Sequence, residues 1–123
     1  MNLHPLLILV AGPYRSGTGD DPAKIEVNMR AMNEAALAVF RRGHVPITGE
    51  ALALPLIELA GSVRIGDGPF TEIFHPLAER LVGRCDACLR IGGASQGADA
   101  MVRLAREAGR AVFDSIDAVP VLP

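Results

Sequence analysis

The chain has 123 residues, of which 50% are hydrophobic and 21% are charged, and its formal net charge is −2. This length fits one domain, and the composition is that of a globular protein rather than a disordered chain. The acidic balance, with one Tyr, four Phe and no Trp, argues against a basic surface or a run of stacking rings for a nucleic-acid polymer. We therefore expect a single domain over residues 1–123 with no nucleic-acid polymer as a partner.

The apolar run over residues 6–12 is too short to span a bilayer. No basic segment precedes it, and Gly-Pro-Tyr-Arg at residues 12–15 follows it in place of a small-residue cleavage site. We expect a buried strand there, no membrane partner and a cytoplasmic protein. Cys85 and Cys88 are too few for a secreted disulfide framework, so we expect them to pack as small buried side chains.

Glycine and proline divide the chain into alternating strands and helices. Residues 6–11 are continuously apolar, which is typical of a strand buried on both faces. Asp21 and Pro22 then begin a helix as its cap and first residue, and Arg-Arg-Gly at residues 41–43 ends it. Pro55 is expected to interrupt the second helix. Further strands are predicted over residues 45–48, 85–91 and 111–113, with a frayed fifth over 119–121, and further helices over 50–59, 70–81 and 98–108.

Strands that alternate with helices favour a parallel sheet with right-handed crossovers and helices on both faces. The predicted fold class is therefore α/β, with a four- or five-stranded parallel sheet. Ligands of such sheets bind beyond the carboxyl ends of the strands, near the point where the strand order reverses. We therefore expect the loops at residues 12–21, 48–50 and 92–97 to face one cleft and to carry the function.

Residues 92–97 join a predicted buried strand to a helix, and Ser95 and Gly97 lie where that helix begins. Unpaired backbone N–H groups and the positive end of the helix dipole favour a phosphate or carboxylate at such a position. Ser95 could add its hydroxyl group, and Gly97 would let an anion approach the backbone. An ordinary capping role for Ser95, with glycines that only form the turn, stays equally open.

Residues 12–19 follow the first strand, but they contain neither the Gly-Lys-Ser/Thr ending of a P-loop nor a G-x-G-x-x-G motif. The standard ATP-hydrolysing and dinucleotide-binding motifs are therefore missing. Gly12, Tyr14, Arg15 and Ser16 are candidate ligand contacts, because arginine pairs with phosphate and tyrosine covers a ring or donates its hydroxyl. The alternative is a solvated turn with Arg15 in water.

The histidines give weaker indications. His44 follows a helix-ending glycine and is expected to be structural or solvated. His75 has Glu72 and Glu79 on neighbouring helical turns, a spacing that could hold a metal. The chain lacks the second Cys pair or the His pair that would complete a zinc site. We expect no metal and no cofactor.

Residues 11–14, Ala-Gly-Pro-Tyr, resemble the opening of the nucleoside deoxyribosyltransferase-like superfamily. Residues 85–91 and the Ser-Gln-Gly-Ala motif at 95–98 resemble its later strand and its phosphate or sugar loop, so that the likeness covers residues 6–113. Members include deoxyribosyltransferases and deoxynucleoside monophosphate N-glycosidases. The resemblance implies a Rossmann-like three-layer domain, a nucleoside or nucleotide-like small molecule as ligand, and assembly as a homo-oligomer.

Catalysis in this superfamily uses a glutamate nucleophile on the helix after the Ser-x-Gly loop and an aspartate on the preceding helix. The matching positions of this chain are Met101 and Ala78, which cannot serve as carboxylates. Asp99 and Glu50 are nearby carboxylates that could replace them, and the alternative is that both are exposed acidic residues at helix starts. Two functions are therefore expected: an N-glycosidase or deoxyribosyltransferase-like enzyme with relocated carboxylates, or a non-catalytic nucleotide-binding module that has lost the nucleophile.

Overall fold

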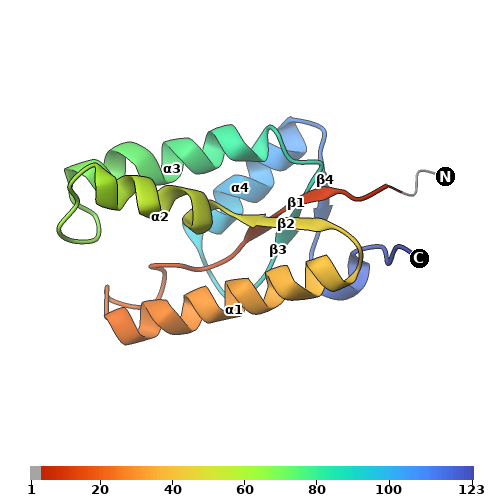
Figure 1. Ribbon diagram of the computed structural model, residues 1–123, viewed down its shortest axis with the longest axis horizontal. Coiled ribbons are helices and arrows are strands. Elements are labelled where there is room, and N and C mark those ends of the chain that lie inside the picture. The colour runs from red at the N-terminus through yellow and green to blue at the C-terminus, as the bar shows by residue number, and fades with distance from the viewer. Residues whose placement is uncertain (1–3) are drawn as a thin grey trace.

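Four parallel strands form the sheet of the computed structural model, which describes residues 4–123 (Figure 1). They are β1 (Leu7–Ala11), β2 (Val45–Thr48), β3 (Ala87–Arg90) and β4 (Ala111–Phe113), in the order β2-β1-β3-β4. β1 lies inside the sheet, where its apolar run is covered on both faces. The predicted α/β fold with a parallel sheet is therefore confirmed, with four strands.

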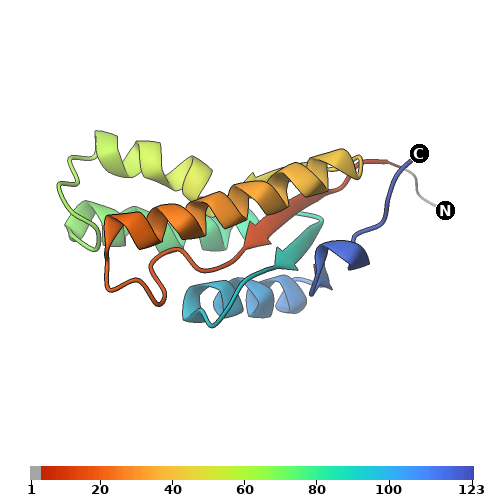
Figure 2. The ribbon, with the colours of Figure 1, turned by 90° about the horizontal axis from the view of Figure 1, so that it is seen from below.

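Helices cover both faces of this sheet. The helix α1 (Pro22–Arg41) lies on one face, below the sheet in Figure 1, and α3 (Gly68–Val82) and α4 (Gln96–Glu107) lie above it, whereas α2 (Gly49–Leu59) extends from the end of β2 beside α3. In Figure 2, which views the molecule from below, α1 lies in front of the sheet. The layers follow from the alternation of side chains along β1, because successive residues of a strand point to opposite faces. Ile8 and Val10 join the core under α1, whereas Leu9 and Ala11 join the core under α3 and α4.

A side chain at the N-cap position caps each of the helices α1 to α4. Thr48 ends β2 and accepts a hydrogen bond from the Ala51 N–H at 3.1 Å, which caps α2. Asp21 caps α1 as predicted, with Pro22 as the first helical residue. The expected interruption at Pro55 is wrong, because α2 continues through this exposed proline to Leu59. A proline in a helix removes one backbone donor, and here its ring faces outward.

The chain after β4 corrects a second expectation, because the frayed fifth strand over residues 119–121 does not form. A short 3-10 helix (Ile116–Ala118) comes first, and Val119 is then buried in the core under α1. The following segment binds the end of α1 instead of the sheet edge. Arg42 donates to the Val119 carbonyl at 3.0 Å, and the Leu122 N–H donates to the Arg42 carbonyl at 2.9 Å.

From the sequence, His44 is expected to be either structural or solvated, and the structure shows a structural role. The side chain is buried, and its Nδ1 accepts a hydrogen bond from the Leu6 N–H at 3.0 Å. The proton of the neutral ring is therefore on Nε2, which lies 2.6 Å from the Pro120 carbonyl oxygen and donates to it. The ring thus ties the start of β1 to the C-terminal segment.

Cys85 and Cys88 are free and buried, as expected. Burial raises the pKa of the Cys88 thiol to about 11, so this thiol is protonated and unreactive at neutral pH. No helix within residues 4–123 is both long and apolar enough to cross a membrane.

Candidate functional site

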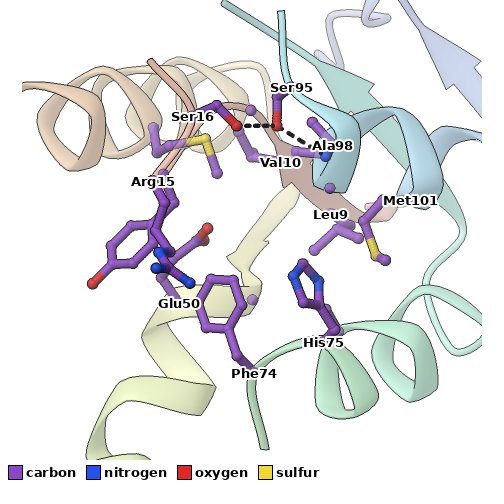
Figure 3. Close-up of a pocket in the computed structure, with 17 residues that line it drawn as sticks. Leu9, Val10, Arg15, Ser16, Glu50, Phe74, His75, Ser95, Ala98 and Met101 are labelled. Atoms are coloured by element: carbon purple, nitrogen blue, oxygen red, sulfur yellow. Dashed lines mark hydrogen bonds between the residues drawn. The ribbon is translucent and has the colours of Figure 1, made fainter. Parts of the chain in front are cut away.

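A cavity of about 130 Å³ opens at the carboxyl edge of the sheet. The loop after β1 leads to β2 on one side, and the loop after β3 leads to β4 on the other. The cavity lies at this divergence, which is where parallel sheets of this kind bind ligands. Its wall comes from the ends of β1 and the loops after β1, β2 and β3, together with side chains of α1, α3 and α4 (Figure 3).

The structure brings together most of the residues that the sequence predicts for the site. All four of the candidates after β1 line the cavity, as do one after β2 and two at the start of α4. These seven residues are Gly12, Tyr14, Arg15, Ser16, Glu50, Ser95 and Gly97. The predicted meeting of the three loops is therefore observed, whereas their contact with a ligand stays a prediction.

Asp99, the other candidate carboxylate, does not line this cavity. Its side chain is 71% exposed and accepts a hydrogen bond from the Arg90 guanidinium at 3.1 Å. The first turn of α4 directs it outward, because Ala98 and Met101 occupy the inward face of that turn. The expectation that Asp99 flanks the pocket is therefore wrong. The alternative, that Asp99 is an exposed acidic residue at a helix start, agrees with the structure.

Ser16 and Ser95 join two walls of the cavity. The Ser16 hydroxyl donates to the Ser95 Oγ at 3.2 Å, and the Ser95 Oγ also accepts from the Ala98 N–H at 3.2 Å (Figure 3). Ser95 is therefore the N-cap of α4 and a lining residue at the same time. The backbone at the start of α4 offers further N–H groups at this end of the cavity.

Aromatic rings form the side of the cavity below these serines in Figure 3. Phe74 lines the cavity and stacks on Phe70 with ring centroids 4.7 Å apart, and the Tyr14 ring lies 5.3 Å from Phe74. The His75 ring meets Phe74 edge-on at 5.2 Å. Such a surface suits the face of another planar or nonpolar ring.

Of the Asp and Glu residues in the described range 4–123, Glu50 alone lines the cavity, and it is only 7% exposed. The alternative of an exposed glutamate at a helix start is therefore wrong for this residue. Its carboxylate forms no ion pair with any residue of the described range 4–123. Burial raises the pKa of Glu50, although a hydrogen bond from its own backbone N–H opposes the shift. Burial and the charge of Glu50 also raise the pKa of Tyr14.

His75 stands against the start of α4 rather than in a metal site. A Cβ atom placed on Gly97 would lie 3.2 Å from the His75 Cε1, so the ring packs directly against the backbone there. Residues 4–123 contain no group of three or more His, Cys, Asp or Glu side chains that could hold a metal ion. His75 thus belongs to the cavity wall between Phe74 and Met101 (Figure 3).

Sequence reasoning from the loops missed several lining residues because they come from helix interiors. Met32 reaches the cavity from α1, and Phe74 and His75 reach it from α3. Met101 and Ala78 also line it. The sequence contains one indication that Met101 and Ala78 lie at the site, because the family resemblance matched these two positions to catalytic carboxylates. The cavity therefore presents a thioether and a methyl group there, with Glu50 on another wall.

Comparison with protein-family models found no match to this chain, and comparison with curated proteins found no significant similarity.

Proposed function

We propose that this chain binds a nucleoside or nucleotide-like small molecule in the cavity at the carboxyl edge of the sheet. One observation carries the proposal: a single cavity joins an aromatic wall to a cluster of hydroxyl and backbone donors at a helix start. A nucleoside has the matching parts, namely a planar base and a sugar with hydroxyl groups. The resemblance to the nucleoside deoxyribosyltransferase-like superfamily supports the same ligand class.

The size of the cavity limits what it encloses. An apolar cavity of about 150 Å³ accepts one benzene ring, and this cavity measures about 130 Å³. One ring of the ligand therefore fits inside, and the remainder lies at the open side. The enclosed ring would lie along Phe74 and Tyr14, whereas Ser16 and Ser95 would meet hydroxyl groups of the sugar.

The binding proposal is tested by thermal unfolding with a panel of nucleosides and their 5′-monophosphates. A ligand at a hundred times its dissociation constant stabilises the folded state by about 2.7 kcal/mol. Ala78→Leu fills the cavity and should abolish this shift, whereas Ala31→Leu makes the same change at an exposed position of α1 and should leave it intact. No shift with any member of the panel, or equal shifts in both variants, would count against the proposal.

N-glycosidic bond cleavage is the second candidate, favoured by the buried carboxyl group of Glu50. A raised pKa suits a general acid, which protonates the leaving base. In this scheme a water oxygen bonds to the sugar carbon as the bond to the base breaks. The proton of Glu50 goes to the base, and a proton of the water restores the acid. The double displacement of the family needs a second carboxylate, which no other lining residue supplies.

Release of free base from deoxynucleosides and deoxynucleotides decides between an enzyme and a binding module. If Glu50 is the acid, Glu50→Gln should lower the rate by about 10²-fold or more, while Glu58→Gln on the same helix should not. Binding without base release in the wild type would favour the non-catalytic module. Base release that survives Glu50→Gln would remove Glu50 from the mechanism.

A homo-oligomer belongs to the same proposal, since the resemblance implies one. Apolar side chains stand exposed on α1 and α2, where a second copy would cover them. Light scattering after gel filtration should give a mass above the 13.0 kDa of one chain. The exposed apolar side chains of the two helices are Val27, Leu37, Phe40, Leu52, Leu56 and Leu59.

A further inference from the structure

The charges at the cavity are not arranged for an anion. Apart from Tyr14, the ionisable residues that line it are Arg15, Glu50 and His75. Glu50 brings a carboxyl group, and among residues 4–123 Arg15 is the only one that brings a guanidinium to the wall. Whether Arg15 is available therefore decides whether a phosphate finds a guanidinium partner there.

The Arg15 guanidinium forms an ion pair with the Asp20 carboxylate. The Arg15 Nε donates to one carboxylate oxygen of Asp20 at 2.9 Å, and the Nη2 atom donates to the other at 2.8 Å. This two-point arrangement matches the fork of the guanidinium to the carboxylate. The hydrogen bond from Arg15 lowers the pKa of Asp20, so the carboxylate is ionised at neutral pH. The guanidinium also lies over the Phe70 ring, 5.5 Å from its centroid.

The backbone around Asp20 has an unusual conformation that hydrogen bonds of Thr18 stabilise. Asp20 has a φ of 61°, a left-handed conformation that costs energy for a non-glycine residue. The Thr18 Oγ1 holds it by accepting from the Asp20 N–H at 3.0 Å and donating to the Arg15 carbonyl at 2.5 Å. Thr18 is only 5% exposed within an otherwise open loop. These bonds fix the backbone of Asp20 relative to the backbone of Arg15.

The guanidinium of Arg90 is also paired with other groups. Arg90, at the end of β3, bonds to Asp99 at 3.1 Å and to the Gly93 carbonyl at 2.8 Å, and it does not line the cavity. A phosphate at the start of α4 would therefore meet hydroxyl and backbone donors without a free guanidinium, and Glu50 would face it across the cavity. To bind the Nε–Nη2 edge of Arg15 it would have to displace a carboxylate that is tethered five residues away, in an ion pair whose two side chains are each 41% exposed.

We infer that the site selects an uncharged nucleoside over its 5′-phosphate, and that Asp20 sets this preference by occupying Arg15. The inference rests on the proposed function and specifies the ligand class within it. Asp20 acts as a positioning residue, because its effect on the ligand passes through Arg15. It is an alternative to the expectation that Arg15 pairs with a phosphate, which stays a prediction.

The test compares the affinities of a 2′-deoxynucleoside and its 5′-monophosphate by calorimetry at constant ionic strength. The wild type should bind the nucleoside more tightly. Asp20→Asn should tighten binding of the monophosphate by about tenfold and leave the nucleoside unchanged, because a charged hydrogen bond to Arg15 becomes available. Asparagine tolerates the left-handed conformation at this position, so the loop should keep its shape.

Two further variants show whether the gain passes through Arg15. Glu34→Gln removes the same charge from an exposed ion pair with Arg30 on α1, and it should change neither affinity. In the double variant Arg15→Gln with Asp20→Asn, the gain for the monophosphate should disappear. A wild type that prefers the monophosphate, or a preference that Asp20→Asn does not shift, overturns the inference and leaves the proposed function standing. Binding of neither ligand, with the variants folded, would overturn both.

Discussion

The hydroxyl groups of Ser16 and Ser95 lie 3.2 Å apart, although 79 positions separate the two residues in the chain. Ser16 follows β1 and Ser95 begins α4 after β3, so the hydrogen bond joins the two loops that diverge from the middle of the sheet. The same Ser95 oxygen accepts from the Ala98 N–H. One buried oxygen therefore serves both the helix and the cavity wall.

Ser95→Ala should destabilise the fold by about 1 kcal/mol, because α4 loses its cap and the Ala98 N–H loses a partner. Urea unfolding measures the change. Ser115 is the matched control, since it precedes a 3-10 helix without a side-chain cap bond. Ser115→Ala should stay within about 0.5 kcal/mol of the wild type. Equal losses in the two variants would show that the Ser95 cap contributes nothing.

Gly12→Ala and Gly97→Ala should differ sharply in stability, although both glycines line the cavity. A Cβ atom on Gly12 would lie 2.8 Å from the Ile91 Cγ1 and 3.0 Å from the Ile91 carbonyl oxygen. Backbone cannot move aside cheaply, so Gly12→Ala should cost about 1–3 kcal/mol. On Gly97 the nearest atom is the His75 ring at 3.2 Å, which can rotate away. Thermal unfolding should show a clear loss for the first variant and less than about 1 kcal/mol for the second; a reversed order would contradict this packing.

Glu50→Gln should stabilise the protein at neutral pH. Burial raises the pKa of Glu50 in the folded state above its usual 4.5, so between the two pKa values the folded state binds more protons than the unfolded state. Stability contributed by the protonated form is then lost as the pH rises through the folded-state pKa. One unit of difference corresponds to about 1.4 kcal/mol.

Unfolding free energies measured from pH 4 to 8 check this sign. The advantage of Glu50→Gln over the wild type should be smallest at pH 4 and should grow toward neutrality. Glu58→Gln, at an exposed position of the same helix, should show no such trend. An advantage that shrinks as the pH rises would mean that the folded state stabilises the ionised carboxylate.

His44→Leu should lower the free energy of unfolding by about 1–3 kcal/mol. The substitution keeps a bulky side chain but leaves the Leu6 N–H and the Pro120 carbonyl without their partner. Hydrogen exchange should also show earlier opening of the segment after residue 118, because the ring anchors it to β1. Unchanged stability and exchange would show that water replaces the ring at no cost.

Most of the fold could be predicted because local signals agree with the tertiary structure. The apolar run of β1, the Asp21-Pro22 start of α1 and the Ser95 start of α4 each correspond to an observed element. The sequence-based predictions were wrong where a proline or an apolar segment is compatible with two different structures. Pro55 lies within α2, and residues 119–121 are apolar because Val119 packs under α1 and not because they pair with a strand.

The candidate site could be predicted in part. The rule for parallel sheets placed the loops after β1, β2 and β3 together, and Glu50 and Ser95 lie there. It could not place Phe74 or His75, because their approach depends on how α3 packs against α4. Nor could it separate Glu50 from Asp99. Both are acidic residues in a first helical turn, and only the rotation of each helix about its axis decides which one faces the cavity.

The central claim, that the cavity binds a nucleoside, is tested most directly by following the backbone amides by NMR during titration with a 2′-deoxynucleoside. Saturable shifts are expected for the amides of Gly12, Ser16, Glu50 and Gly97, which come from three separate segments of the cavity wall. Arg103 and Asn33, on the outer faces of α4 and α1, should not move. Absence of shifts at millimolar nucleoside, or shifts confined to those outer faces, would contradict the account.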